Sequence, residues 1–412
     1  MQLKNLSFKV LRDTPILILV LLYSYDLLTY LPELFSASIV KIIYYLIIIL
    51  FYALYIIISQ RNGKLSFNTK DLFFQVTLLF CLIYLTRVVY DLYIVDILHK
   101  TFTNKFTYIF LFLNSVIIPL ITLKIIDYSK ISFKKLYIIF TILIVFCLII
   151  SFNNVIILGL TGGRFSANTA LDPISYGHLG ITLFLLGLTF FIYPSKTFIK
   201  ILNILVMLFG LFSSILANSR SPIVALIGCI LFYTFATKRY KILVVSLLAI
   251  SFFVIYIDKM DTFFQSFGSG FAQRIYLSVT ANNVADVTSG RSSIYNIGLE
   301  QFLNSPFFGS SFLIQNGIFR GEYVHNLILE AFISVGIFGG LLYIFSILIT
   351  VKNAYHLIRL NEKYIFVSFL FIQYLIYSMF SRSIISLPLF WLSLFMVNNI
   401  YNFEKRNLTS NV

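Results

Sequence analysis

Residues 133–152 read "FKKLYIIFTILIVFCLIISF". After Lys134 and Lys135 this stretch has no charged side chain, and nearly every residue is apolar. About 20 apolar residues in an α-helix span the hydrocarbon core of a bilayer, which is about 30 Å thick. Backbone N–H and C=O groups in lipid must be satisfied within their own segment, so this run predicts a transmembrane helix.

The composition extends this interpretation to the whole chain. Of 412 residues, 59% are hydrophobic and 11% are charged, and the mean hydropathy is +0.93. Water-soluble domains carry about 25% charged residues. The sequence therefore predicts an all-α integral membrane protein. Its net charge of +15 is better explained by basic cytoplasmic loops than by nucleic-acid binding.

The length criterion predicts about twelve transmembrane helices. They occupy approximately residues 14–31, 38–59, 72–96, 107–126, 133–152, 176–193, 198–216, 222–236, 240–257, 325–351, 363–380 and 383–402. The first run contains Asp26 and lacks a small-residue cleavage site, so we expect a retained span and not a removed signal peptide.

The distribution of Lys and Arg predicts the orientation of these spans. With the N-terminus in the cytoplasm, most basic residues fall in cytoplasmic segments, as the positive-inside rule requires. Both termini are then cytoplasmic. Two outward segments are long, 153–175 and 258–324. The chain accordingly divides into spans one to nine (1–257), a large extracytoplasmic loop (258–324), and spans ten to twelve with a cytoplasmic tail (325–412).

The large loop contains "RSSIYNIGLEQFLNS" at residues 291–305. Its apolar residues recur with a helical spacing, which predicts an amphipathic helix on the membrane surface. "NSPFFGSS" at 304–311 then predicts a turn at Pro306 and Gly309. The three cysteines lie apart in apolar runs, without the spacing of a disulfide framework or a zinc site. Motifs for nucleotide binding or for serine or metal hydrolysis do not occur.

Four arginines lie on the predicted outer face, where the positive-inside rule disfavours them. They are Arg164, Arg220, Arg291 and Arg382. Each could simply extend to lipid phosphate. Three of them are flanked by Gly or Ser, and together they favour a specific anion site. Arginine beside the N-terminus of a helix binds phosphate well.

Two of these arginines precede predicted helix starts on the outer face. In "SRSP" we expect Ser221 to cap a helix that begins at Pro222, directly after Arg220. "SRS" at 381–383 repeats the arrangement without the proline. Several such sites on one face predict a diphosphate ligand at the outer leaflet.

His325 lies in "GEYVHNLILEAFISVGIFGG", residues 321–340, where the tenth span begins. A helix N-terminus disfavours protonation, so we expect a neutral imidazole that can act as a general base. The alternative is an interfacial histidine bonded to backbone, for example as a cap. Gly336, Gly339 and Gly340 predict close helix packing. Arg87 and Asp91, spaced i, i+4, are expected to pair inside the bundle.

Four stretches together resemble the O-antigen polymerase and O-antigen ligase superfamily. They are "GGRFSANTALDPISYGHLG" (162–180), "ANSRSPIVALIGCILF" (217–232), "NSPFFGSS" (304–311) and "VHNLILEAFISVGIFGG" (324–340). The resemblance runs through about residues 160–340, and the number of spans agrees over the whole chain.

The resemblance implies a glycosyltransferase at the outer face of the bacterial inner membrane. Its donor would be an oligosaccharide on undecaprenyl diphosphate. Arg164 and Arg220 match the diphosphate-binding arginines, Arg291 matches a catalytic position in the large loop, and His325 matches the proposed base. Further support at the site is expected from Tyr323, Asn326, Glu330 and Arg382.

The implied reaction needs no nucleotide, cofactor or metal, because arginines and helix N-termini can stabilise the leaving diphosphate. A polymerase of O-antigen or capsule repeat units is favoured, and a ligase that transfers polymer to the lipid A core is the alternative. A transporter of the lipid-linked sugar is disfavoured because the polar residues gather at one face, not at mid-membrane. The expected partners are the lipid-linked substrate, membrane lipid and a chain-length regulator protein.

Overall fold

The computed structural model describes residues 15–23, 71–100, 104–158, 172–193, 196–256 and 291–410, with a few single positions between them. Within this part of the chain every regular element is a helix. The predicted all-α fold is therefore confirmed, and the long apolar helices agree with an integral membrane protein.

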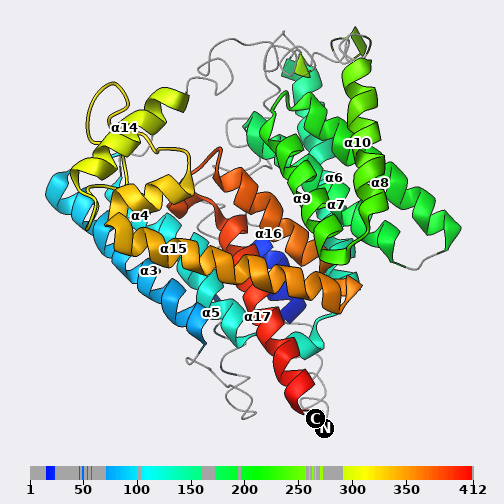
Figure 1. Ribbon diagram of the computed structural model, residues 1–412, viewed down its shortest axis with the longest axis horizontal. Coiled ribbons are helices and arrows are strands. Elements are labelled where there is room, and N and C mark those ends of the chain that lie inside the picture. Colours follow the sequence, from blue (N-terminus) through cyan, green and yellow to red (C-terminus); the bar gives the residue numbers. More distant parts are fainter. Residues whose placement is uncertain are drawn as a thin grey trace.

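The helices are distributed over the whole described part (Figure 1). In chain order they are α3 Leu72–Tyr90, the π-helical turn η1 Asp91–Val95, α4 Lys105–Phe112, the π-helical turn η2 Leu113–Ile117, α5 Ile118–Ile125, the 3-10 turn η3 Tyr128–Lys130, α6 Phe133–Leu158, α7 Pro173–Ile192, α8 Thr197–Leu216, α9 Ser221–Thr237, α10 Tyr240–Ile255, α14 Arg291–Asn304, α15 Leu327–Leu360, the 3-10 turn η4 Glu362–Tyr364, α16 Ile365–Ser378, the 3-10 turn η5 Ile384–Ser386, and α17 Pro388–Ser410.

Six segments are long and apolar enough to cross a bilayer, and each coincides with a predicted span. They are Leu72–Val95, Lys105–Ile125, Phe133–Phe152, Pro173–Ile192, Thr197–Leu216 and Leu327–Leu360. The apolar helix α9 is shorter, and α10, α16 and α17 lie at three further predicted spans. The predicted runs 14–31 and 38–59 fall largely outside the described residues, so the total of twelve stays a prediction.

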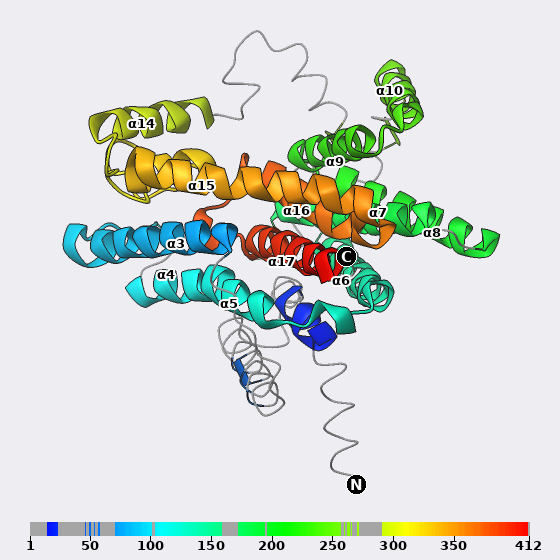
Figure 2. The same ribbon diagram turned by 60° about the horizontal axis from the view of Figure 1, so that its bottom comes forward.

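Helix α15 is the central element of the bundle. It packs against α3, α9, α14, α16 and α17, and Figure 2 shows it between α14 on one side and α3 and α17 on the other. Buried polar side chains join these helices: the Thr77 hydroxyl donates to Ser346 Oγ at 3.0 Å, and Asn398 Nδ2 donates to Thr350 Oγ1 at 2.7 Å. Such interhelical hydrogen bonds stabilise packing where lipid supplies no hydrophobic driving force.

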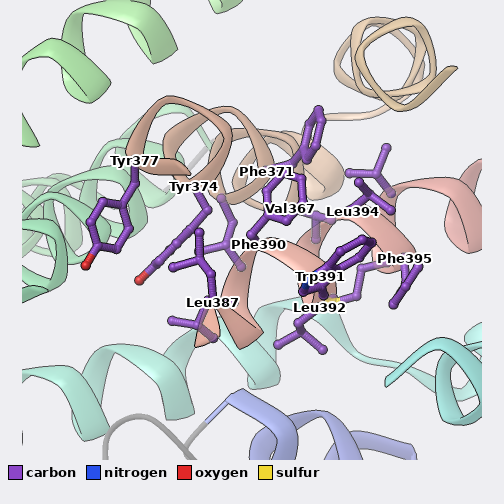
Figure 3. Close-up of a cluster of buried hydrophobic side chains, with 14 of the residues drawn as sticks. Val367, Phe371, Tyr374, Tyr377, Leu387, Phe390, Trp391, Leu392, Leu394 and Phe395 are labelled. Carbon is purple, nitrogen blue, oxygen red and sulfur yellow. The ribbon is translucent and has the colours of Figure 1, made fainter. Parts of the chain in front are cut away.

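Large aromatic side chains fill the space between α16 and α17 (Figure 3). Trp391 is fully buried and stacks on Phe395, with ring centroids 5.6 Å apart. Its indole N–H donates to the carbonyl of Ile384 at 2.9 Å, so the polar atom of this side chain is satisfied. Tyr377 lies at the edge of the cluster, with its hydroxyl directed away from Trp391. This core fixes the connection between α16 and α17, which carries Arg382.

The prediction that Gly336 serves helix–helix packing is wrong, because the residue interrupts α15. Gly336 has φ 68° and ψ −168° inside the helix, a conformation that only glycine adopts readily. A Cβ atom there would lie 2.1 Å from the carbonyl oxygen of Phe307. The backbone of the 306–310 loop thus enters the break. Close helix packing occurs instead between α7 and α8, where a Cβ on Gly180 would lie 2.5 Å from Gly210 O.

Substitution of Gly336 tests this break. We expect Gly336→Ala to lower the thermal midpoint strongly, because it combines a strained φ with a backbone collision. Gly317→Ala is the matched control: Gly317 also has a positive φ, but its nearest neighbour to an added Cβ is 3.9 Å away. The control should lose only about 1–2 kcal/mol. Equal losses in the two detergent-purified variants would contradict the role of the close approach.

Candidate functional site

The end of α3 holds the loop that enters the α15 break. Arg87 donates hydrogen bonds to three consecutive carbonyls, from Phe308 at 2.9 Å, Gly309 at 3.3 Å and Ser310 at 3.1 Å. Asp91 Oδ2 accepts from the N–H of Phe312 at 2.9 Å. Nη1 of Arg87 lies 3.6 Å from Oδ1 of Asp91, so the predicted i, i+4 ion pair is confirmed. The pair therefore binds the loop and also joins the last turn of α3 to η1.

His325 lies where this loop meets α15. Its φ of 57° places it in the left-handed region, which is strained for a residue with a side chain. The cap of α15 is Asn326, whose Oδ1 accepts from the N–H of Leu329 at 3.0 Å. His325 is thus not the cap, and its buried Nδ1 has no hydrogen-bond partner among the described residues. A strained histidine with a ring nitrogen left open is a candidate for chemistry.

Burial first, and then the positive charge of Arg291, lower the pKa of His325 to about 4. Glu322 acts in the opposite direction, while His99 and Arg382 add small lowering effects. The predicted neutral imidazole is therefore supported, but its main causes are burial and a neighbouring arginine. From the sequence, the neutral state was attributed to the helix N-terminus, and neither burial nor Arg291 was included as a cause.

A wall of side chains from the α3–α4 connection faces the residues before His325. The ring of His99 stacks on Tyr323, with centroids 4.6 Å apart and planes 22° apart. Lys100 Nζ forms an ion pair of 2.6 Å with Glu322. Tyr323 is buried, and its hydroxyl has no partner among the described residues. The supporting role of Tyr323 at the site stays a prediction.

Glu330 is a buried junction one turn into α15. Its carboxylate accepts from the hydroxyls of Tyr84 at 2.5 Å and Ser383 at 2.7 Å. It also accepts from the backbone N–H of Ile384 at 3.2 Å. Glu330 thereby joins α3, α15 and the α16–α17 connection. It holds the segments that carry His325 and Arg382, through contacts with protein groups of the described residues.

Arg382 is bound to the protein and is not a free helix-end arginine. Its Nη2 donates to Asp172 Oδ2 at 2.9 Å and to Ser175 Oγ at 2.6 Å, and its Nε donates to the Tyr377 hydroxyl at 3.2 Å. The helix start after "SRS" is a 3-10 turn from Ile384, and α17 begins at Pro388. Because the first N–H of that turn is taken by Glu330, the predicted anion site at this helix start is wrong.

Arg220 stands at the start of α9, as predicted, but Ser221 does not cap it. The N-cap residue is Arg220, and Ser221 is the first helical residue, followed by Pro222. The Ser221 hydroxyl lies 3.2 Å from Nε2 of His178, and the His178 ring stacks on Tyr377 at 4.1 Å. The hydroxyl is engaged by α7, which explains why it does not serve the backbone. This contact also brings Arg220 to the end of the bundle that holds Arg382.

The predicted helix in 291–305 is α14, Arg291–Asn304, and its position on the membrane surface stays a prediction. Ile294, Gly298 and Gln301 are buried, and an added Cβ on Gly298 would meet Ile333 of α15 and Val324. Leu299 and Leu303 are exposed. Arg291, at the first residue of α14, is brought within electrostatic range of His325 by this packing.

The structure thus gathers Arg220, Arg291, His325 and Arg382 at one end of the bundle, which we call the site end. It comprises the starts of α7, α9, α14, α15 and η5. Arg164 and most of residues 258–290 lie outside the described part. Sequence reasoning missed His99, Asp172 and Glu322. Asp172 had a readable signal, since an aspartate directly before Pro173 is typical of a helix start.

The fold and the site end define an all-α membrane protein with a polar, arginine-rich face. A family model described as O-antigen ligase matches residues 204–344 of the 412. This stretch includes Arg220, Arg291, His325 and the α15 break. The match supports the predicted membership of the O-antigen ligase and polymerase superfamily, and with it an enzyme of that general type. No curated protein matches the chain.

Replacing Glu330 tests its junction role. In Glu330→Ala the Tyr84 and Ser383 hydroxyls and the Ile384 N–H lose their acceptor, and each buried unsatisfied donor costs about 1–3 kcal/mol. We expect a large drop in the thermal midpoint of the purified protein. The control is Glu300→Ala on the exposed face of α14, which should change stability by less than about 0.5 kcal/mol. Matching midpoints would show that Glu330 does not join these segments.

Proposed function

We propose that this protein transfers an oligosaccharide from undecaprenyl diphosphate to an acceptor hydroxyl at the site end. The observation that carries the proposal is His325: a strained, neutral histidine with an open ring nitrogen, beside Arg291, within the stretch that the family model matches. A neutral base next to a cation suits a reaction in which a hydroxyl loses a proton while an anion departs.

In the proposed reaction the acceptor oxygen attacks the anomeric carbon of the donor. The bond from that carbon to the diphosphate oxygen breaks, and its electron pair leaves with the diphosphate. His325 takes the proton of the acceptor hydroxyl. Arg291 and Arg220, together with Arg164, stabilise the negative charge on the leaving group. Asn326 and Glu330 act by positioning, since one caps α15 and the other joins it to its neighbours.

The same charges can adjust the basicity of His325 during the reaction. Without substrate, burial and Arg291 hold the pKa of His325 at about 4, which makes a weak base, because efficient proton transfer needs a pKa near the working pH. A diphosphate bound beside Arg291 supplies compensating negative charge. It would therefore raise the pKa of His325 and strengthen the base only when the donor is present.

The acceptor separates two candidate functions. We favour the polymerase, whose acceptor is another lipid-linked repeat unit, in O-antigen or capsule synthesis at the outer face of the inner membrane. The second candidate is the ligase, whose acceptor is the lipid A core. It is favoured by one observation, the description of the matching family model as O-antigen ligase.

Deletion of the gene distinguishes these acceptors by the surface polysaccharide pattern on a gel. For the polymerase we expect single repeat units still attached to their terminal acceptor and no ladder. Loss of all attached polysaccharide, with long polymer retained on the lipid carrier, would assign the ligase instead. An unaltered ladder in the deletion strain would contradict both candidate functions.

Complementation of the deletion strain with His325→Ala tests the base. We expect loss of about 10²–10⁴-fold in activity, which is what general base catalysis contributes, while membrane abundance is unchanged. His356→Ala is the matched control, because His356 lies 31 residues further along the sequence, near the opposite end of α15. Wild-type polymer from His325→Ala would remove the base from the proposal.

The effect of Arg291 on His325 is visible in the pH dependence of kcat/KM, which reports the free enzyme. Activity should fall as the pH drops through the pKa of His325, because the protonated ring cannot accept a proton. Arg291 lowers this pKa, so the residual activity of Arg291→Gln should show its acid limb at higher pH. Arg320 is an exposed arginine of the same loop, and Arg320→Gln should leave the acid side of the pH profile unchanged. An unchanged acid side in Arg291→Gln would contradict the effect of Arg291 on the pKa of His325.

A further inference from the structure

A cavity lies at the end of the bundle opposite the site end, and we call this the far end. It has a volume of about 1000 Å³, at the upper end of the range of small-molecule sites. Its walls come from the first turns of α6 and α8, the end of α7, the short turns η3 and η4, and the end of α17. Figure 1 shows α6, α7 and α8 on the same side of the molecule.

The side chains show that the cavity opens toward lipid. Ile138 and Ile142 of α6 and Leu202 of α8 line it, and all three are exposed on the apolar flank of predicted spans, Ile142 at 62%. Phe190 and Tyr193 form part of the inner wall. A hydrocarbon chain can therefore enter from the side of the bundle without crossing a polar surface.

A buried polar group lies inside this largely apolar wall. Asn203 lines the cavity and is 7% exposed. Its Nδ2 is buried and has no hydrogen-bond partner among the described residues. A buried amide without a partner is destabilising, so this group calls for a hydrogen-bond acceptor from a bound molecule. The ester carbonyl of a lipid, which lies between headgroup and chains, is such an acceptor.

The rim of the cavity is basic. Lys134 lines it, is exposed, and forms no ion pair or hydrogen bond within the described part of the chain. Lys363 also lines it, with its Nζ 3.5 Å from Glu404, so its charge is partly compensated. The rim thus offers one uncompensated positive charge, from Lys134, to an anionic headgroup.

From these features we infer that the far-end cavity is a binding site for an anionic phospholipid. The acyl chains occupy the lipid-facing gap between α6 and α8, the Asn203 amide donates to an ester carbonyl, and Lys134 binds the phosphate. The glycosyl donor is a poorer occupant. Helix α7 has 20 residues and is about 30 Å long, so a diphosphate at the far end lies about one helix length from the start of α7, where Asp172 meets Arg382.

The test uses the full-length protein in detergent and native mass spectrometry, with phosphatidylglycerol, phosphatidylcholine or undecaprenyl phosphate added at equal concentration. We expect phosphatidylglycerol to be retained in preference to the other two. Equal retention of phosphatidylcholine would overturn the anionic preference. Preferential retention of undecaprenyl phosphate would overturn the phospholipid and assign the cavity to the polyprenyl carrier.

Two matched pairs of variants locate the bound lipid. Lys134→Gln should weaken phosphatidylglycerol binding about fivefold, whereas Lys135→Gln, at the exposed neighbour that does not line the cavity, should have no effect. Leu202→Trp should abolish the adduct by filling the gap. Leu205→Trp, on the same helix and 57% exposed but outside the cavity, should not. Equal effects within either pair would overturn the site.

Discussion

The interruption of α15 at Gly336 is the constraint on which the site depends. A helix break frees backbone groups that must be satisfied inside a membrane, and here the 306–310 loop satisfies them. The N–H of Ile337 donates to the carbonyl of Pro306 at 2.8 Å, and the N–H of Ser310 donates to the carbonyl of Ile333 at 2.7 Å. The loop and the helix are therefore one unit, and Arg87 and Asp91 hold that unit on α3.

This unit explains how His325 keeps an unfavourable conformation. A left-handed backbone at a non-glycine residue costs on the order of 1–3 kcal/mol and persists only where the surroundings enforce it. His325 is enclosed between the anchored loop and Asn326, the cap of α15. Arg382 also has a positive φ, 72°, and is held by Asp172 and Tyr377. Glu330 ties the two strained positions together through Ser383.

The two ends of the bundle differ in how they arrange positive charge. At the site end Arg291 and Arg382 lie close enough to lower the pKa of the half-buried His325. At the far end the lysine at the cavity rim borders an apolar gap. The two proposals accordingly assign a phosphate-bearing lipid to each end, and a reaction to the site end alone.

Local patterns were sufficient for the helices and for the first set of site residues. Apolar runs of about 20 residues predict spans because the bilayer imposes that length. The i, i+4 spacing of Arg87 and Asp91 predicted their ion pair, and the helical spacing in 291–305 predicted α14. Arg291 and His325 stood out because positive charge and histidine are unusual at an outward helix start.

Contacts between distant segments were decided only by the tertiary structure. Glu330 meets Tyr84, which is 246 residues away, and Arg382 meets Asp172, which is 210 residues away. No local pattern shows which helix start is already occupied by a carboxylate, so η5 was wrongly predicted as an anion site. The role of Gly336 was hidden for the same reason.

By itself the sequence determined an all-α membrane protein with arginines and a histidine on one face, because hydropathy and charge act locally. Packing decided which of those groups form bonds within the protein. The protonation state of a buried group depends on its neighbours in space, which local sequence does not reveal.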